Sequence, residues 1–165
     1  MGHAGAGRPS EGVAKLRKAF ATVGEHNQLW LARTLIWLGE AQVETGAMIE
    51  ARASADEALA RAQARGERFD EAYALRLQGG IAVSSGNPDR AEEKYREALG
   101  IATELGMRPL VAHCHRGFAK LYQGTPKREE AQAHLSTAMA MYREMRMTYW
   151  LENAQRQIEN LESDG

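Results

Sequence analysis

The stretch GGIAVSSGNPDRAEEKYREALGIATELG, residues 79–106, carries a complete set of the signals that decide the fold. Its Asn-Pro-Asp segment, residues 87–89, is typical of a helix start, because it supplies an N-cap side chain, a first-turn proline and an early acid. Ala91 and Ala98 then lie seven residues apart, on one face of the predicted helix. Gly106 predicts a C-terminal cap. The stretch therefore predicts the end of one helix, a tight turn and a complete second helix.

The same pattern recurs on both sides of this stretch at a fixed offset of about 40 residues. Small residues in register indicate places where two helices approach closely, and recurrence at a fixed offset indicates a structural repeat. Six columns of similar residues fall in register: Ala32, Ala72 and Ala112; Gly39, Gly79 and Ala119; Gly46, Gly86 and Pro126; Ala51, Ala91 and Ala131; Ala58, Ala98 and Ala138; Leu59, Leu99 and Met139. Each unit thus contains a first helix, a turn and a second helix.

The repeat predicts a flexible lead over residues 1–10 and a single helical repeat domain over residues 11–165. The three full units are expected at about 27–66, 67–106 and 107–146. Eight helices are expected, at about 11–23, 28–44, 47–65, 68–85, 88–105, 108–123, 127–145 and 148–162. The last helix becomes polar after its first turn, as the terminal element of a stack of repeats requires.

The order and spacing of these small residues resemble the tetratricopeptide repeat. That resemblance implies an all-α fold, an α-α superhelix of three helix pairs with a leading helix and a C-terminal capping helix. The usual unit has about 34 residues, so the extra residues of each unit in this chain are expected to lengthen the second helices. Ala119 and Pro126 depart from the usual glycines, which is expected to stiffen the third turn. At position 146 an arginine replaces the capping glycine, so that cap is expected to be less secure.

Residues 113–154, which include KLYQGTPKREEAQAHLSTAMAMYREMRMTYWLENA, resemble the C-terminal helical repeats of bacterial multidomain adenylate/guanylate cyclases and related signalling ATPase regulators. In that family the helical array is a regulatory scaffold, and the chemistry lies in other domains. The resemblance implies a non-catalytic regulatory module of bacterial signalling, either a free-standing relative or a C-terminal fragment of such a protein.

Charge and hydropathy exclude two classes of partner. The net charge is −1, from 21 basic and 22 acidic residues, whereas nucleic-acid binders usually carry a clustered basic excess. The longest apolar stretch, residues 29–43, is too short to span a bilayer and is interrupted by Arg33 and Glu40. We therefore expect neither a nucleic-acid nor a membrane partner. The single cysteine, Cys114, fits a reducing cytoplasm.

A partner is expected on the face of the first helices that lines the concave side of such a stack. Residues on one helix face recur at three- and four-residue spacing. Counted in register, the predicted binding residues are Arg33, Ile36 and Glu40; Tyr73, Arg76 and Gly80; and His113, Arg116 and Lys120. The face becomes basic through Arg76, Arg116 and Lys120, and guanidinium groups suit capture of carboxylates. We predict a protein or peptide partner, with an acidic peptide favoured.

Three alternatives stay open at this point. The polar side chains could be solvated groups of a soluble repeat protein that holds no ligand there. A metabolite or signalling peptide could fill the groove, which would make the domain a sensor. An enzyme would need a site assembled from scattered residues such as Glu40, His113 and His115.

No metal, cofactor or catalytic site is predicted. His113, Cys114 and His115 are adjacent on a helix and point in different directions, so they cannot converge on one ion. Cys114 is expected to be a buried thiol. Four methionines are expected to fill the core before the last helix: Met139, Met141, Met145 and Met147. Trp30, Trp37 and Trp150 are expected to pack as well, although terminal repeats with exposed apolar side chains could self-associate.

Overall fold

The computed structural model describes residues 9–24 and 30–163, and in these ranges helices are the only regular elements. The helices are α1 (Pro9–Gly24), α2 (Leu31–Glu44), α3 (Met48–Arg65), α4 (Arg68–Ser84), α5 (Pro88–Glu104), α6 (Arg108–Tyr122), α7 (Arg128–Glu144) and α8 (Thr148–Ser163). Each predicted helix is present, and the all-α, tetratricopeptide-like fold class is confirmed. Most of the predicted lead, residues 1–8, lies outside the described residues, whereas residues 9 and 10 begin α1.

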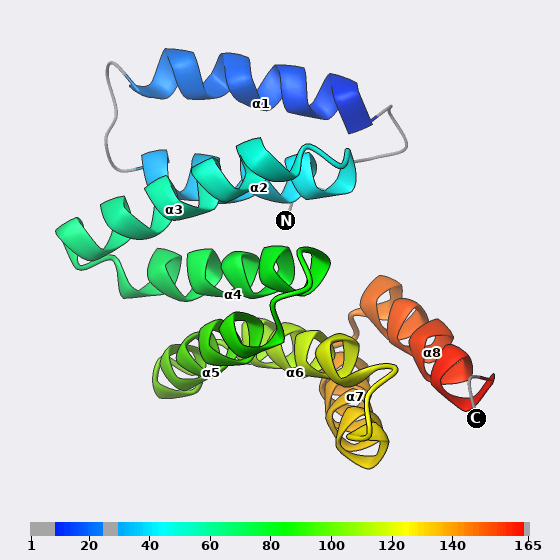
Figure 1. Cartoon of the computed structure of the whole chain (residues 1–165). Coiled ribbons are helices and arrows are strands. Elements are labelled where there is room, and N and C mark those ends of the chain that lie inside the picture. The colour runs from blue at the N-terminus through cyan, green and yellow to red at the C-terminus, as the bar shows by residue number, and fades with distance from the viewer. Residues whose placement is uncertain (1–8, 25–29, 164–165) are drawn as a thin grey trace. The chain divides into compact units, whose positions relative to one another are not determined.

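The chain divides into two compact units, residues 1–81 and 82–165, and the division falls within α4. In the first unit α1 packs against α2, and α2 packs against α3 (Figure 1). In the second unit α5 packs against α6, α6 against α7, and α7 against α8. The single domain over residues 11–165 stays a prediction. None of the helices in the described ranges has the length and apolar character needed to cross a membrane.

The second helices end in the same hydrogen-bonded turn, which explains one column of the repeat. After α3, Gly66 has a left-handed φ of 67° and Glu67 N–H donates to the Ala62 carbonyl at 2.8 Å. Gly106 repeats this conformation after α5 with a φ of 65°. After α7 the turn is kept although Arg146 stands at this position, with a φ of 54°. Such a φ is unfavourable for a residue with a β-carbon, so the third cap carries backbone strain.

The turn between α6 and α7 differs from the prediction. The alignment of the repeats placed Pro126 at the position of the turn glycines, but the left-handed residue is Gly124, with a φ of 72°. Proline fixes φ near −65° and cannot adopt that conformation. The chain therefore reverses two residues earlier, and Thr125 Oγ1 accepts a hydrogen bond from Lys127 N–H at 3.2 Å.

Alanines allow the helices of the first unit to approach closely. Ala51 and Ala55 of α3 are fully buried and cluster with Leu77 and Ile81 of α4. A second cluster joins Leu35, Ile36, Ala58 and Ala74, from α2, α3 and α4. The small side chains predicted as close-contact positions thus lie in the core.

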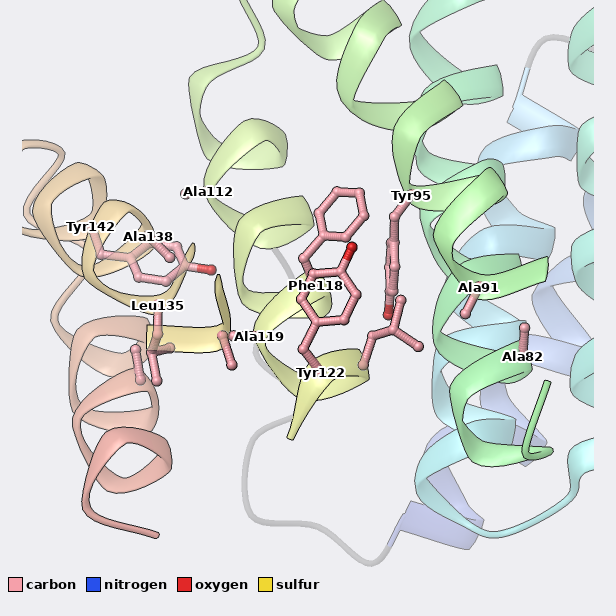
Figure 2. Packing of buried hydrophobic residues seen from close by; sticks show 13 residues of the cluster. Ala82, Ala91, Tyr95, Ala112, Phe118, Ala119, Tyr122, Leu135, Ala138 and Tyr142 are labelled. Carbon is pink, nitrogen blue, oxygen red and sulfur yellow. The ribbon is translucent and has the colours of Figure 1, made fainter. Parts of the chain in front are cut away.

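Aromatic rings fill the core of the second unit. Figure 2 shows the Tyr95 ring facing those of Phe118 and Tyr122, with the Tyr95 and Phe118 ring centroids 5.4 Å apart. Gly117 makes room for Tyr95, because a β-carbon there would lie 2.5 Å from Tyr95 Cζ. The four methionines pack against this cluster together with Trp150, Leu151 and Ile158, which confirms them as core residues. Cys114 is fully buried, as predicted.

Candidate functional site

In the first unit two partly buried ion pairs join α2 and α4. Arg33 Nε donates to Asp70 Oδ1 at 2.6 Å, and Asp70 is only 6% exposed. Two turns further along α2, Glu40 forms an ion pair with Arg76 of α4. Both arginines thus have a carboxylate of this chain beside them, so an acidic ligand would compete with Asp70 and Glu40 for them.

Two rings lie beside these ion pairs. The Arg33 guanidinium lies 4.6 Å from the centre of the Phe69 ring, and the Phe69 and Tyr73 ring centroids are 5.2 Å apart. Burial raises the pKa of the Tyr73 hydroxyl above its ordinary value, while Arg76 and Arg33 act in the opposite direction. Tyr73 is therefore neutral at physiological pH and offers a flat, half-buried contact surface.

The structure gives Ile36 a different environment from the other predicted residues. Its side chain is 2% exposed and belongs to the core cluster with Ala58 and Ala74. It therefore contributes to stability and offers no surface to a partner. The three- and four-residue spacing does not separate the exposed from the buried side of α2, because one residue is a rotation of only about 100°.

In the second unit two of the predicted residues of α6, His113 and Arg116, contact Trp150 of α8. The Arg116 guanidinium lies 4.8 Å from the Trp150 ring centre, and the His113 ring meets Trp150 edge-on at 4.6 Å between centroids. His113 Nδ1 also lies 2.6 Å from the Tyr142 hydroxyl oxygen. Lys120, one turn beyond Arg116, is exposed. This face therefore presents a guanidinium beside an aromatic ring, with a second cation one turn further along the helix.

The sequence matches the family described as "Tetratricopeptide repeat" over residues 30–104 and again over residues 70–144. The second match is displaced from the first by one repeat unit, and together the two span most of the chain. The chain belongs to the tetratricopeptide repeat family. A comparison with curated proteins gave no match. Tetratricopeptide repeats generally mediate protein–protein interaction, which supports a scaffold role, and proteins built from them are typically non-catalytic.

Two residues of this tetratricopeptide repeat protein that shape the candidate faces, Phe69 and Asp70, were missed by the sequence analysis, and Trp150 was predicted only as a packing residue. Phe69 is 43% exposed and lies four residues before Tyr73 and seven before Arg76. Extending the same spacing back by one turn would have found it. Asp70 and Trp150 carry no such signal, because their roles depend on contacts with residues of other helices.

Trp30 and Trp37, at the start and in the middle of the α2 segment, are not packed as predicted. Trp30 is 56% exposed and Trp37 is 46% exposed. At the position one repeat after Trp37, Leu77 is 4% exposed against Ala51 and Ala55 of the preceding helix. The packing prediction is therefore wrong for these two tryptophans, whereas it is confirmed for Trp150.

His113 and His115 contact different partners. His113 meets Tyr142 and Trp150, whereas His115 meets His134 of α7. Within the described ranges no three or more histidine, cysteine, aspartate or glutamate side chains are grouped so as to hold a metal ion.

Proposed function

We propose that this tetratricopeptide repeat protein is an interaction module whose first helices bind a protein or peptide partner, and that the face of α6 receives an acidic segment of it. What carries the proposal is the Arg116 guanidinium over the Trp150 ring, with the exposed Lys120 one turn further along α6. A guanidinium that stacks on a ring keeps its charge and its in-plane N–H groups, which suit carboxylate oxygens.

The faces of α2 and α4 take a different part in this proposal. Because Arg33 and Arg76 already lie against Asp70 and Glu40, a carboxylate of the partner would have to replace a carboxylate of the chain. Phe69 and Tyr73 instead offer ring surface, and aromatic residues are enriched in the centres of protein interfaces. We assign to this face apolar contact with the partner.

The biological setting is part of the proposal. Its support is the resemblance of residues 113–154 to the helical arrays of bacterial cyclases and signalling ATPase regulators. We place the module in the cytoplasm, where a reduced Cys114 is the stable form. The same resemblance fits both a free-standing regulator and a fragment of a larger signalling protein.

Self-association is a further part of the proposal, supported by the exposed Trp30 and Trp37 side chains. Trp37→Ser should lower the weight-average mass seen in sedimentation at high protein concentration if these side chains join two copies. An unchanged mass would remove self-association from the account.

The experiment is partner capture from bacterial lysate, with retained proteins identified by mass spectrometry. Wild type is compared with Arg116→Glu/Lys120→Glu and with a matched control, Arg128→Glu/Arg143→Glu, which makes the same charge change at exposed positions of α7. We expect a partner retained by wild type and by the control and lost by the α6 variant, with all three chains folded by circular dichroism. Equal retention by all three would contradict the proposal, and an absence of partners would favour a small-ligand sensor.

A further inference from the structure

Two histidine rings meet between α6 and α7. Nδ1 of His115 lies 2.8 Å from Nδ1 of His134, and the ring centroids are 5.1 Å apart. Both side chains are partly buried. At this distance one nitrogen donates a hydrogen and the other accepts it.

The pair occupies positions that the other two repeats fill differently. In the register of the repeat His115 corresponds to Leu35 and Leu75, which are 2% and 1% exposed. His134 corresponds to Ser54 and Lys94. The third helix pair thus has an imidazole at a position where leucine would form an apolar contact that does not respond to pH.

The surroundings of the pair are mostly aromatic. The Phe118 ring stacks on His134 with centroids 4.9 Å apart, and the Tyr122 ring centroid lies 5.9 Å from that of His134. Burial lowers the pKa of both histidines, and His134 lowers the pKa of His115 further.

Charged groups on the neighbouring helices act on the pair and on its aromatic contacts. Glu130, one turn before His134 on α7, favours protonation of His134. Burial raises the pKa of the Tyr122 hydroxyl, and the nearby carboxylate of Glu92 on α5 raises it further. Lys127, just before α7, lies over the Tyr122 ring.

The contact tolerates only a limited number of protons. Two neutral rings share one N–H···N hydrogen bond when they adopt complementary tautomers, and one added proton leaves an acceptor in place. A second added proton puts a hydrogen and a positive charge on both facing nitrogens, so that the 2.8 Å contact becomes repulsive.

We propose that His115 and His134 form a pH-sensitive joint that holds α6 against α7 while at least one ring is neutral and loosens that helix pair when both are protonated. The joint goes beyond the proposed binding function, because it acts without a partner. It lies on the helix that also carries His113, Arg116 and Lys120.

The sign of the effect follows from proton linkage. In the unfolded chain both histidines have pKa values of about 6.5. Because the folded pKa values are lowered, the unfolded chain binds protons more readily on acidification. The stabilisation is therefore complete above the unfolded pKa and is lost as the pH falls through the folded values.

The test compares urea unfolding of wild type with that of His115→Leu, which installs the side chain found in the other two repeats. Measurements run from about pH 7.5 to about pH 5, the range in which histidine changes charge, with a chelator present to remove bound metal ions. We expect the folded-to-unfolded ratio of wild type to fall several-fold more on acidification than that of His115→Leu. Parallel acid dependence of wild type and His115→Leu would overturn the proposal.

A second measurement keeps the proposal testable if His115→Leu does not fold. The ring protons of wild-type His115 and His134, followed by NMR, should titrate below the ordinary histidine range, and each curve should change when the other residue is replaced. Two independent titrations at the ordinary pKa would overturn the joint.

Discussion

Gly117 and Gly39 are two helix glycines at which an added β-carbon would meet different kinds of neighbouring side chain. A β-carbon at Gly117 would lie 2.5 Å from Cζ of the Tyr95 ring, which is itself 4% exposed. A β-carbon at Gly39 would lie 2.6 Å from Leu77 Cδ2, the far end of a flexible side chain, and 3.6 Å from its next neighbours. The closest contact of the added β-carbon is thus similarly short at both sites, but a rigid ring would have to move at Gly117 and only the end of a leucine side chain at Gly39.

We predict that Gly117→Ala lowers the free energy of unfolding by about 1–2 kcal/mol, because overpacking outweighs the gain of about 1 kcal/mol in helix propensity. Gly39→Ala should be close to neutral, since only the end of the flexible Leu77 side chain has to shift. Urea titration of both variants measures this difference. Equal losses at the two sites would show that Tyr95 adjusts as readily as Leu77.

Arg146 offers a prediction of the opposite sign. Its φ of 54° is unfavourable for a side chain with a β-carbon, and glycine stands at the corresponding positions 66 and 106. Arg146→Gly should raise the free energy of unfolding by about 0.5–1 kcal/mol after allowance for the greater flexibility of glycine in the unfolded chain. Gly106→Ala is the matched control and should be destabilising. A loss of stability in Arg146→Gly would mean that the arginine side chain contributes more than its backbone strain costs.

At the residue scale the sequence predicts the environment of a side chain best where its chemistry and its position in the repeat indicate the same environment. The burial of Cys114, the packing of the four methionines and the N-cap at Asn87, whose side chain accepts from Arg90 N–H at 3.2 Å, were all predicted. The exposure of Trp30 and Trp37 was not, because an apolar side chain is buried only if a neighbouring helix covers it. That depends on tertiary packing at the end of the repeats.

At the scale of the helices the ion pair between Arg33 of α2 and Asp70 of α4 is the most informative contact. The side chain of Asp70 is 8% exposed and that of Arg33 is 27% exposed. At the corresponding positions 30, 110 and 150 the residues are tryptophan, leucine and tryptophan. An acid therefore stands here in place of an apolar residue, and its burial depends on the arginine.

Arg33→Ala should lower the free energy of unfolding by about 1–3 kcal/mol, because the carboxylate of Asp70 stays in place without its cation. Adding Asp70→Leu, with the side chain found at position 110, should recover most of the loss. Thermal and urea unfolding of the two variants and the wild type checks this. A double variant no more stable than Arg33→Ala would show that Asp70 does not require its partner.

The helix boundaries could be predicted because small residues, turns and caps are encoded locally and recur in each repeat unit. The α6–α7 turn could not, because Pro126 excludes the left-handed conformation and Gly124 supplies it. Most of the predicted binding residues lie on partly or fully exposed faces, and Glu40 and Arg76 are in contact. The prediction failed for Ile36, which is buried. Sequence spacing alone does not fix how far α2 is rotated about its axis.

At the scale of the whole molecule the repeats have the same fold, but their faces carry different side chains. The α2 and α4 faces combine ion pairs with Phe69 and Tyr73, whereas the α6 face combines Arg116 and Lys120 with Trp150. A shared backbone thus presents different chemistry in each unit.

The most direct test of the central claim, that the first helices carry the binding surface, is photo-crosslinking in lysate. A photoreactive phenylalanine replaces Phe69 of the first helix α4 or Tyr149 of α8, which stands two repeat units later at the position that matches Phe69; as controls it replaces Ile49 or Leu105 in the second-helix segments. All four side chains are exposed. The account predicts adducts with a common partner from positions 69 and 149 and none from positions 49 and 105. Adducts from positions 49 and 105 alone would contradict it.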